Sequence, residues 1–169
     1  AVPADEKWDI ESVFADESAW RAALTAALAR APAIAAHAGH LGDSGTRLWE
    51  ALSARDALGL EAYRIIMYAQ ALLSTDGTNQ RYAAMMGEAS GALAQLMGAM
   101  AFFDPELLAL PAARLTALMA EEPRLSRYQH AFDRLRVNAA HVRSAEVEQV
   151  MAMAQSAFAT GEAVAEAAN

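Results

Sequence analysis

The chain has 169 residues, a net charge of −8 at pH 7, 55% hydrophobic residues and no cysteine. A chain of this length can bury one substantial core, and its hydrophobic content is typical of folded proteins. Its acidic charge and scattered arginines disfavour nucleic-acid binding and attachment to an anionic membrane surface. Without cysteine, it has neither disulfides nor thiolate metal sites.

The first predicted helix begins after Asp16, a suitable N-cap residue that precedes the acidic Glu17. We expect Pro32 to interrupt this helix, because proline lacks a backbone N–H, and a second short piece to run on to residues 37–38. The glycine-rich run 39–45 is typical of a loop. The apolar residues at helical spacing in the first helix are Trp20, Leu24 and Leu28.

A second helical region follows over residues 48–71, in which Gly59 is a candidate break, and residues 74–77 form the next turn signal. The strongest periodicity of the chain comes after this turn. A second stripe of small residues on the same helix predicts the close approach of a neighbouring backbone. The apolar stripe is Tyr82, Met86, Ala89, Leu93, Leu96, Met100 and Phe103, and the small stripe is Gly87, Gly91, Ala94 and Gly98.

Asp104 and Pro105 resemble the N-cap and first residue of a further helix, and Pro111 restarts the chain again. Another helix is expected over 125–138, and Ser144 can cap a last one. The sequence therefore predicts an all-α fold, a single helical domain over 1–169 built as a bundle of about six to eight mostly antiparallel helices. The uncharged stretch 89–103 is shorter than the roughly 20 residues that span a bilayer, so no membrane segment is predicted.

The histidines do not form a recognisable metal motif. The zinc-peptidase pattern His-Glu-x-x-His is absent, because none of the four is followed by glutamate, and no glutamate has a histidine three residues later. Two histidines three apart near a helix end do not make a closed site, and we interpret them as solvated. The histidines are His37, His40, His130 and His141. No catalytic residue, no metal ligand and no cofactor is predicted for this chain.

Other kinds of site are equally weak. There is no Gly-x-Ser-x-Gly motif, no cysteine nucleophile and no glycine-rich phosphate loop. Methionines cluster in one helix, at Met85, Met86, Met97 and Met100. We interpret them as core filling, although an apolar cavity of ligand size would favour a small-molecule binder instead. Substrate-binding residues stay unknown at this stage.

Several short sequence motifs occur in the same order as in a known protein family. Trp8-Asp9-Ile10 opens the chain, and the run from Phe103 through Asp104-Pro105 to Pro111 is followed at a suitable distance by Tyr128-Gln129-His130. Each motif is weak alone, but together they resemble the N-terminal helical region of oligoendopeptidase F, of the thimet-oligopeptidase class. The resemblance covers nearly the whole chain.

The resemblance implies a catalytic zinc domain that this chain does not contain. In the family, His-Glu-x-x-His and a further glutamate bind zinc, and the motif glutamate activates the attacking water. The N-terminal helices form one wall of an enclosed cavity that holds the peptide. The expected function is therefore that of a substrate-cavity domain of a zinc-dependent oligoendopeptidase, inactive alone, with the catalytic zinc domain as its partner and zinc only in the parent enzyme.

The alternative function is a self-sufficient helical interaction module. We expect a cytoplasmic location, because charged residues at 5–7 interrupt any secretory signal. The chain ends at Asn169 without a helix stop, which predicts a fragment or one part of a split enzyme. The last predicted helix is apolar around much of its circumference, which predicts a homo-oligomer or a tightly bound second chain. Its apolar residues include Val147, Met151, Ala154 and Phe158.

Overall fold

The computed structural model describes residues 9–139, which fall into two units with a boundary between Arg127 and Tyr128. All regular elements of these described residues are helical, so the all-α class is confirmed. The prediction of one domain over 1–169 stays a prediction, because most of the second unit lies outside the described residues.

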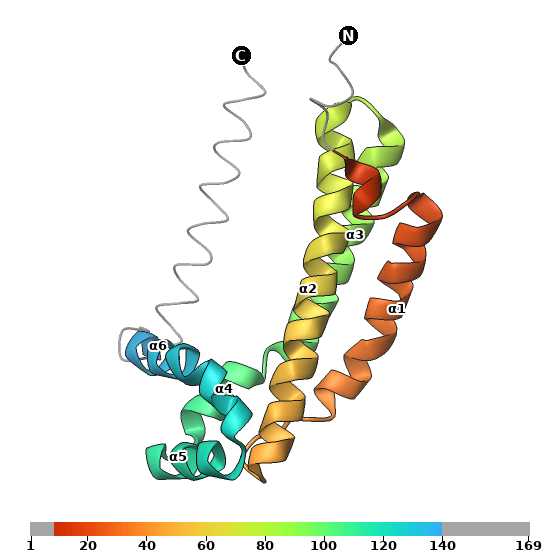
Figure 1. Ribbon diagram of the computed structural model, residues 1–169. Helices are drawn as coiled ribbons and strands as arrows, with labels where there is room; N and C mark the ends of the chain where they lie inside the picture. Colours follow the sequence, from red (N-terminus) through yellow and green to blue (C-terminus); the bar gives the residue numbers. More distant parts are fainter. Residues whose placement is uncertain (1–8, 140–169) are drawn as a thin grey trace. The chain divides into compact units, whose positions relative to one another are not determined.

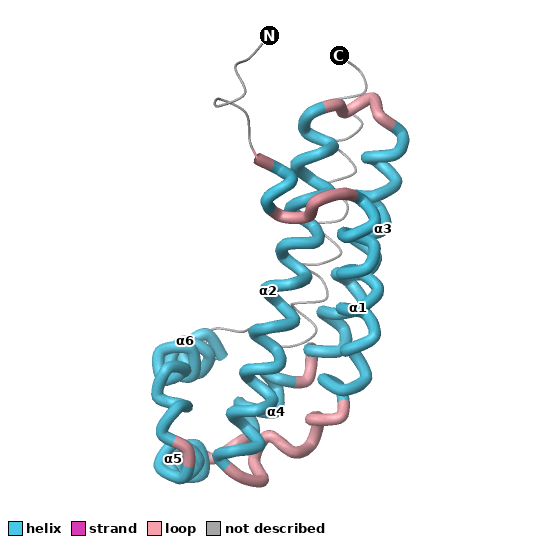
Figure 2. The backbone as a smooth tube through the Cα atoms, turned by 45° about the vertical axis from the view of Figure 1, so that its right-hand side comes forward, coloured by secondary structure: helices cyan, strands magenta, loops and turns pink. Residues whose placement is uncertain are grey.

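Three long helices dominate the first unit: α1 (Glu17–Ala35), α2 (Gly45–Thr75) and α3 (Gln80–Met100). They lie side by side and alternate in direction (Figures 1 and 2). Each begins at a residue whose side chain satisfies an otherwise unpaired N–H of the first turn. Asp16 accepts from Ala19 N at 2.8 Å, as the sequence predicts, and Ser44 and Asn79 do the same for α2 and α3.

The core between these helices consists of large aliphatic side chains and one tryptophan. Trp20 is fully buried, and its indole Nε1 donates a hydrogen bond of 2.9 Å to the carbonyl oxygen of Ile65 in α2. A buried indole N–H needs such an acceptor, so this bond fixes the position of α1 along α2. Other fully buried side chains include Leu41, Leu48, Leu52, Leu58, Met85 and Leu96.

The rest of the first unit consists of shorter helices. The 3-10 helix η2 (Ile10–Ser12) precedes α1, and α4 (Phe103–Ala109) and α5 (Ala112–Glu121) follow α3. The 3-10 helix η3 (Pro123–Tyr128) comes next and crosses the boundary between the units.

In the second unit, the described residues form α6 (Gln129–Ala139). The rings of Tyr128 and Phe132 lie one helical turn apart, with centroids separated by 6.2 Å. The amide of Gln129 donates to Asp133 at 3.0 Å. The predicted helix after Ser144 and its apolar face lie outside the described residues.

Three sequence predictions about helix boundaries are wrong. Pro32 does not interrupt α1, which continues through it and ends at Ala35, although proline has no backbone N–H to donate within the helix. Gly59 does not break α2, which is continuous through it. Asp104 does not cap α4, because the helix already begins at Phe103, and the aspartate lies in its first turn.

The predicted close approach along the small stripe of α3 does not occur among residues 9–139. A Cβ atom added at Gly87, Gly91 or Gly98 would have open space around it, and all three residues are exposed. The buried face of α3 is centred on Met85, Ala89, Ala92 and Leu96, so α1 and α2 pack against the opposite side of the helix. The packing of the described part of the chain therefore does not require small side chains along this stripe.

The predicted number of bundle helices is too high. Five α-helices occur in the described part of the first unit, and only three of them are long enough to pack along their lengths. The short pieces after α3 cap one end and do not extend the bundle. None of the described helices is long and apolar enough to cross a membrane by itself. Gln80–Ala109 and Ala112–Glu121 reach that length and composition only together, across a bend of 110°.

Candidate functional site

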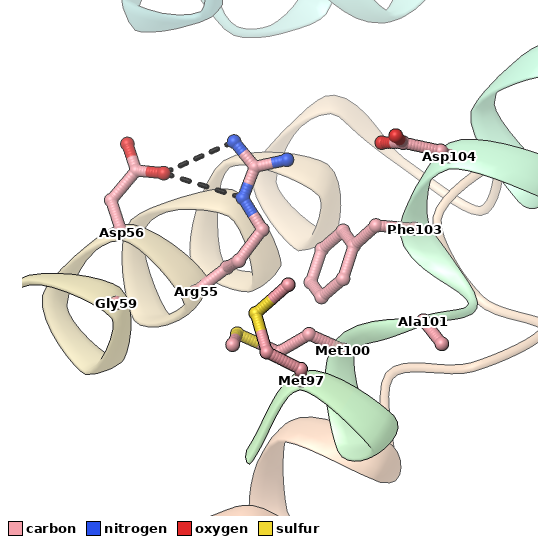
Figure 3. A pocket seen from close by; sticks show the side chains of 8 residues that line it. All are labelled: Arg55, Asp56, Gly59, Met97, Met100, Ala101, Phe103 and Asp104. Carbon is pink, nitrogen blue, oxygen red and sulfur yellow. Dashed lines mark hydrogen bonds and ion pairs between the residues drawn. The ribbon is translucent and has the colours of Figure 1, made fainter. Parts of the chain in front are cut away.

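A pocket of about 540 Å³ opens where the middle of α2 meets the end of α3 and the start of α4 (Figure 3). Its volume is within the range of small-ligand and side-chain pockets. The lining residues come from three helices that follow one another in the chain but meet here from different directions. They are Arg55, Asp56 and Gly59 of α2, Met97 and Met100 of α3, Ala101, and Phe103 and Asp104 of α4.

Arg55 is fixed at one side of the pocket by two neighbours. Its guanidinium carbon lies 5.2 Å from the ring centroid of Phe103, and its Nη2 donates to Asp56 Oδ1 at 3.0 Å. Phe103 is almost fully buried and stacks on Phe102 at a centroid distance of 4.4 Å. A cation over a buried ring, paired with an aspartate, has little freedom to move. The pocket therefore has a pre-formed polar edge.

The opposite side of the pocket is apolar and open. Met97 and Met100 lie below the Phe103 ring in the close-up view (Figure 3). Met97 is 58% exposed, which is unusual for a large apolar side chain in a helix that also has a buried face. Gly59 adds no side chain, and a Cβ atom at its position would meet nothing within 4 Å.

Further exposed apolar side chains continue along α2 from this pocket. Leu60, Tyr63 and Met67 are spaced by three and four residues, so they lie on one outward face. Tyr63 is 60% exposed and Leu60 63%. A row of this kind on a folded surface is a typical contact surface for another molecule or domain.

The histidines of the described residues do not come together. His40 Nδ1 lies 2.9 Å from Asp43 Oδ2 in the loop after α1, where His37 also lies. His130 is exposed at the start of α6, and His141 lies outside the described residues. Among residues 9–139, no three histidine, aspartate or glutamate side chains form a group able to hold a metal ion.

Only part of the pocket could be predicted from the sequence. The methionine cluster includes Met97 and Met100, but the prediction that it fills the core holds fully only for Met85. No sequence motif marks Arg55 or Asp56. An arginine–aspartate pair beside a helical glycine is a weak signal, because the ring that holds the arginine lies 48 positions later in the chain.

Comparisons with known proteins give one consistent family. The family described as Oligopeptidase F matches residues 106–168. Oligopeptidase PepF of Bacillus subtilis (strain 168) is 28% identical over 153 residues, which cover 90% of this chain. Group B oligopeptidase PepB of Streptococcus agalactiae serotype III (strain NEM316) is 30% identical over 160 residues, or 92% of this chain.

The solved structures agree. The crystal structure of oligoendopeptidase-F from Enterococcus faecium matches with a TM-score of 0.66 and 26% identity, over 85% of this chain and 28% of that chain. The chain corresponds to the N-terminal helical region of oligoendopeptidase F-like peptidases. A putative peptidase from Chlamydophila abortus, with a TM-score of 0.73 and 19% identity, supports the fold alone, over 90% of this chain and 26% of that chain.

The resemblance to oligoendopeptidase F, which the order of the short motifs indicated, is thus confirmed. The oligoendopeptidase F relatives are much longer than this chain, which spans 23% of the B. subtilis protein and 26% of the S. agalactiae protein. Their names describe the activity of whole proteins. What the matched region does in this protein is therefore a matter of proposal.

Proposed function

We propose that this chain forms one wall of the substrate cavity of a zinc-dependent oligoendopeptidase that hydrolyses short peptides. The carrying observation is the match over 92% of the chain to a protein named oligopeptidase, of which it spans only 26%. Exposed apolar side chains beside a pocket support a wall role, because a cavity that binds unfolded peptides needs apolar contacts as well as hydrogen bonds.

Zinc, in this proposal, is held outside this chain. The residues present do not fit a zinc site, because the His-Glu-x-x-His pattern is absent from the sequence and no suitable group forms among residues 9–139. The partner is therefore the catalytic zinc domain of the same enzyme, and the ligand is its peptide substrate. A cytoplasmic location is part of the same proposal.

A chimera with the S. agalactiae PepB tests the wall role. We expect PepB without its matching N-terminal region to lose most hydrolysis of a short quenched fluorescent peptide, and this chain, fused in place of that region, to restore it. This chain alone with added zinc should hydrolyse nothing. Circular dichroism of each protein controls for folding. A PepB that keeps full activity without the region, or a folded but inactive chimera, would contradict the proposal.

The alternative is a self-sufficient helical interaction module, and the exposed row Leu60, Tyr63 and Met67 favours it. Sedimentation of the chain at micromolar concentration separates this alternative from the wall role. A stable homo-oligomer that disperses when Tyr63 is changed to serine would favour the module. A monomer that assembles only with the catalytic part of PepB would favour the cavity wall.

A further inference from the structure

We propose that the pocket between α2, α3 and α4 binds a peptide through a large apolar side chain followed by a basic one. The inference rests on the proposed function, since it assumes that the ligand is a peptide. It adds the substrate class and the residues that select it.

The apolar part of the ligand is indicated by the lining. Two thioethers and the edge of a phenylalanine ring surround an open space beside Gly59 (Figure 3). Methionine adapts its shape to different partners and makes favourable contacts with aromatic rings. A phenylalanine or leucine side chain inserted here would cover Met97, which is otherwise more than half exposed.

The basic part of the ligand is indicated by the charges. Arg55 is already neutralised by Asp56, whose Oδ1 accepts two of its hydrogen bonds, at 3.3 and 3.0 Å. Asp104 lines the same pocket, is exposed, and has no ion-pair partner among the described residues. The Asp104 carboxylate is therefore the acidic group of the lining that a ligand can pair with, which favours a cationic neighbour of the apolar side chain and repels an anionic one.

The openness of the pocket argues for a peptide and against a small organic ligand. A small-molecule site usually buries most of its ligand's surface. Here one wall is Met97, and the glycine at position 59 leaves another side without any side chain. A side chain carried on a peptide needs only such a partial enclosure, because its backbone continues along the surface. The outward row of Leu60, Tyr63 and Met67 begins next to this opening.

Methyl NMR of the whole chain tests the inference at one resolved site. With 13C-methyl methionine, the eight methionines report separately, and Met97 and Met100 lie in the pocket, whereas Met67 lies on α2 outside it. Acetylated, amidated Gly-Phe-Arg-Gly is titrated against Gly-Phe-Gln-Gly, Gly-Phe-Glu-Gly and Gly-Ala-Arg-Gly. We expect saturable shifts at Met97 and Met100, with the Phe-Arg peptide bound about three- to tenfold more tightly than Phe-Glu, as for exposed charge pairs.

Two variants with matched controls separate the apolar part from the charged part. Gly59→Leu fills the pocket and removes a helix-interior glycine, so we expect binding to weaken at least about tenfold while Tm rises. Gly91→Leu, at an equally open glycine outside the pocket, should leave binding unchanged. Asp104→Asn should abolish the preference for arginine over glutamate. Asp76→Asn, at an acid in the turn before α3, should keep it.

The outcomes are distinct from those of the chimera. Absence of shifts at Met97 and Met100 with every peptide overturns the inference, whatever the chimera does. Equal affinity for Phe-Arg and Phe-Glu peptides, or binding that survives Gly59→Leu, overturns it as well. An active chimera together with either result would leave the cavity wall standing and show that the wall selects peptides elsewhere.

Discussion

Two glycines of the same helix have opposite surroundings. Gly45, at the start of α2, is buried, and a Cβ atom there would lie 2.5 Å from the carbonyl oxygen of Leu118 and 2.8 Å from Cβ of Glu122. A Cβ atom added at Gly59, in the middle of α2, would meet no atom of another residue's side chain or of another element within 4 Å. The first glycine is therefore required by the packing of α5 on α2, and the second is not required by packing at all.

This difference predicts opposite effects of the same substitution. Gly45→Ala forces α2 and α5 apart and should lower the free energy of unfolding by about 1–3 kcal/mol. Gly59→Ala relieves the conformational entropy cost of a helical glycine and should raise it by about 0.5–1 kcal/mol. Urea denaturation of both variants beside the wild type measures the two values. Changes of the same sign would contradict the described contact between the two helices.

The carboxyl group of Glu122 has a strongly lowered pKa. The Arg124 guanidinium donates to its two oxygens at 2.8 and 2.6 Å, and this pairing lowers the pKa of Glu122 from 4.5 to about 2. The same carboxylate also accepts from the Arg124 backbone N–H at 3.2 Å. Arg124 in turn lies over the Trp49 ring, 4.7 Å from its centroid.

The lowered pKa predicts a pH dependence of stability. An acid with a lower pKa in the folded state stabilises the fold when it is ionised, which is above about pH 4.5, and this stability is lost as the pH falls toward 2. The urea midpoint of the wild type should therefore fall more steeply between pH 5 and pH 2 than that of Glu122→Gln. Arg124→Gln should likewise make the fall of the urea midpoint between pH 5 and pH 2 less steep. Parallel pH profiles of the three proteins would refute this assignment.

At the scale of elements, side chains of α4 and α5 hold the loop that joins α1 to α2. Glu106 of α4 accepts hydrogen bonds from the backbone N–H groups of Gly39 and Leu41, each at 2.7 Å. Arg114 of α5 donates to the carbonyl oxygen of Gly42 at 2.9 and 3.0 Å. Gly39 has a φ of +80°, which glycine adopts without strain. The short helices thus fix the connection between two long ones.

Removing the Glu106 carboxylate should loosen that loop. Glu106→Ala leaves two N–H groups without their acceptor, one of them part-buried, and should cost about 1–3 kcal/mol of unfolding free energy. Hydrogen exchange of the Gly39 and Leu41 amides should accelerate, while the amides inside α3 keep their protection. Asp104→Ala, at a neighbouring exposed acid of α4, serves as the control. Unchanged exchange at both loop amides would show that the two hydrogen bonds to Glu106 do not form in solution.

Across the whole molecule, three kinds of contact stabilise the described residues: buried apolar side chains, helix caps, and hydrogen bonds from side chains to loop backbone. The largest fully buried side chains include Trp20, Phe103 and, in α2, Leu48, Leu52 and Leu58. Among the described residues, no three histidine, aspartate or glutamate side chains lie close enough together to hold a metal ion. We expect the described helices to fold without a metal ion.

Chelation tests this independence. Far-ultraviolet circular dichroism of the chain should show the same helix content and the same Tm with and without EDTA, because no ligand must be deprotonated or ordered around an ion. Apo and zinc-supplemented samples should agree within about a degree in Tm, which is less than the roughly 2–4 °C that 1 kcal/mol produces in a chain of this size. A large loss of helix on chelation would mean that residues outside those described contribute a structural metal site.

Three features could be predicted from the sequence: the helical class, the N-cap at Asp16 and the family. The first two are local, since helix propensity and capping depend on neighbours within one turn. The family followed from the order of short motifs such as Phe103 to Pro111, which needs no coordinates. The continuity of α1 through Pro32 and of α2 through Gly59 was not predictable in the same way, because tertiary packing outweighs the local cost of one unfavourable residue.

Which face of each helix is buried could not be predicted, because it depends on how the helices pack together. Periodicity showed that α3 has an apolar stripe, but Met85 and Ala92 are buried, whereas Met86 and Leu93 are only half-buried, because the position of α1 and α2 around α3 is set by contacts far away in sequence. The same contacts left Met97 exposed and placed Arg55 over Phe103. A pocket assembled from three helices depends on their mutual packing, which no local pattern in the chain specifies.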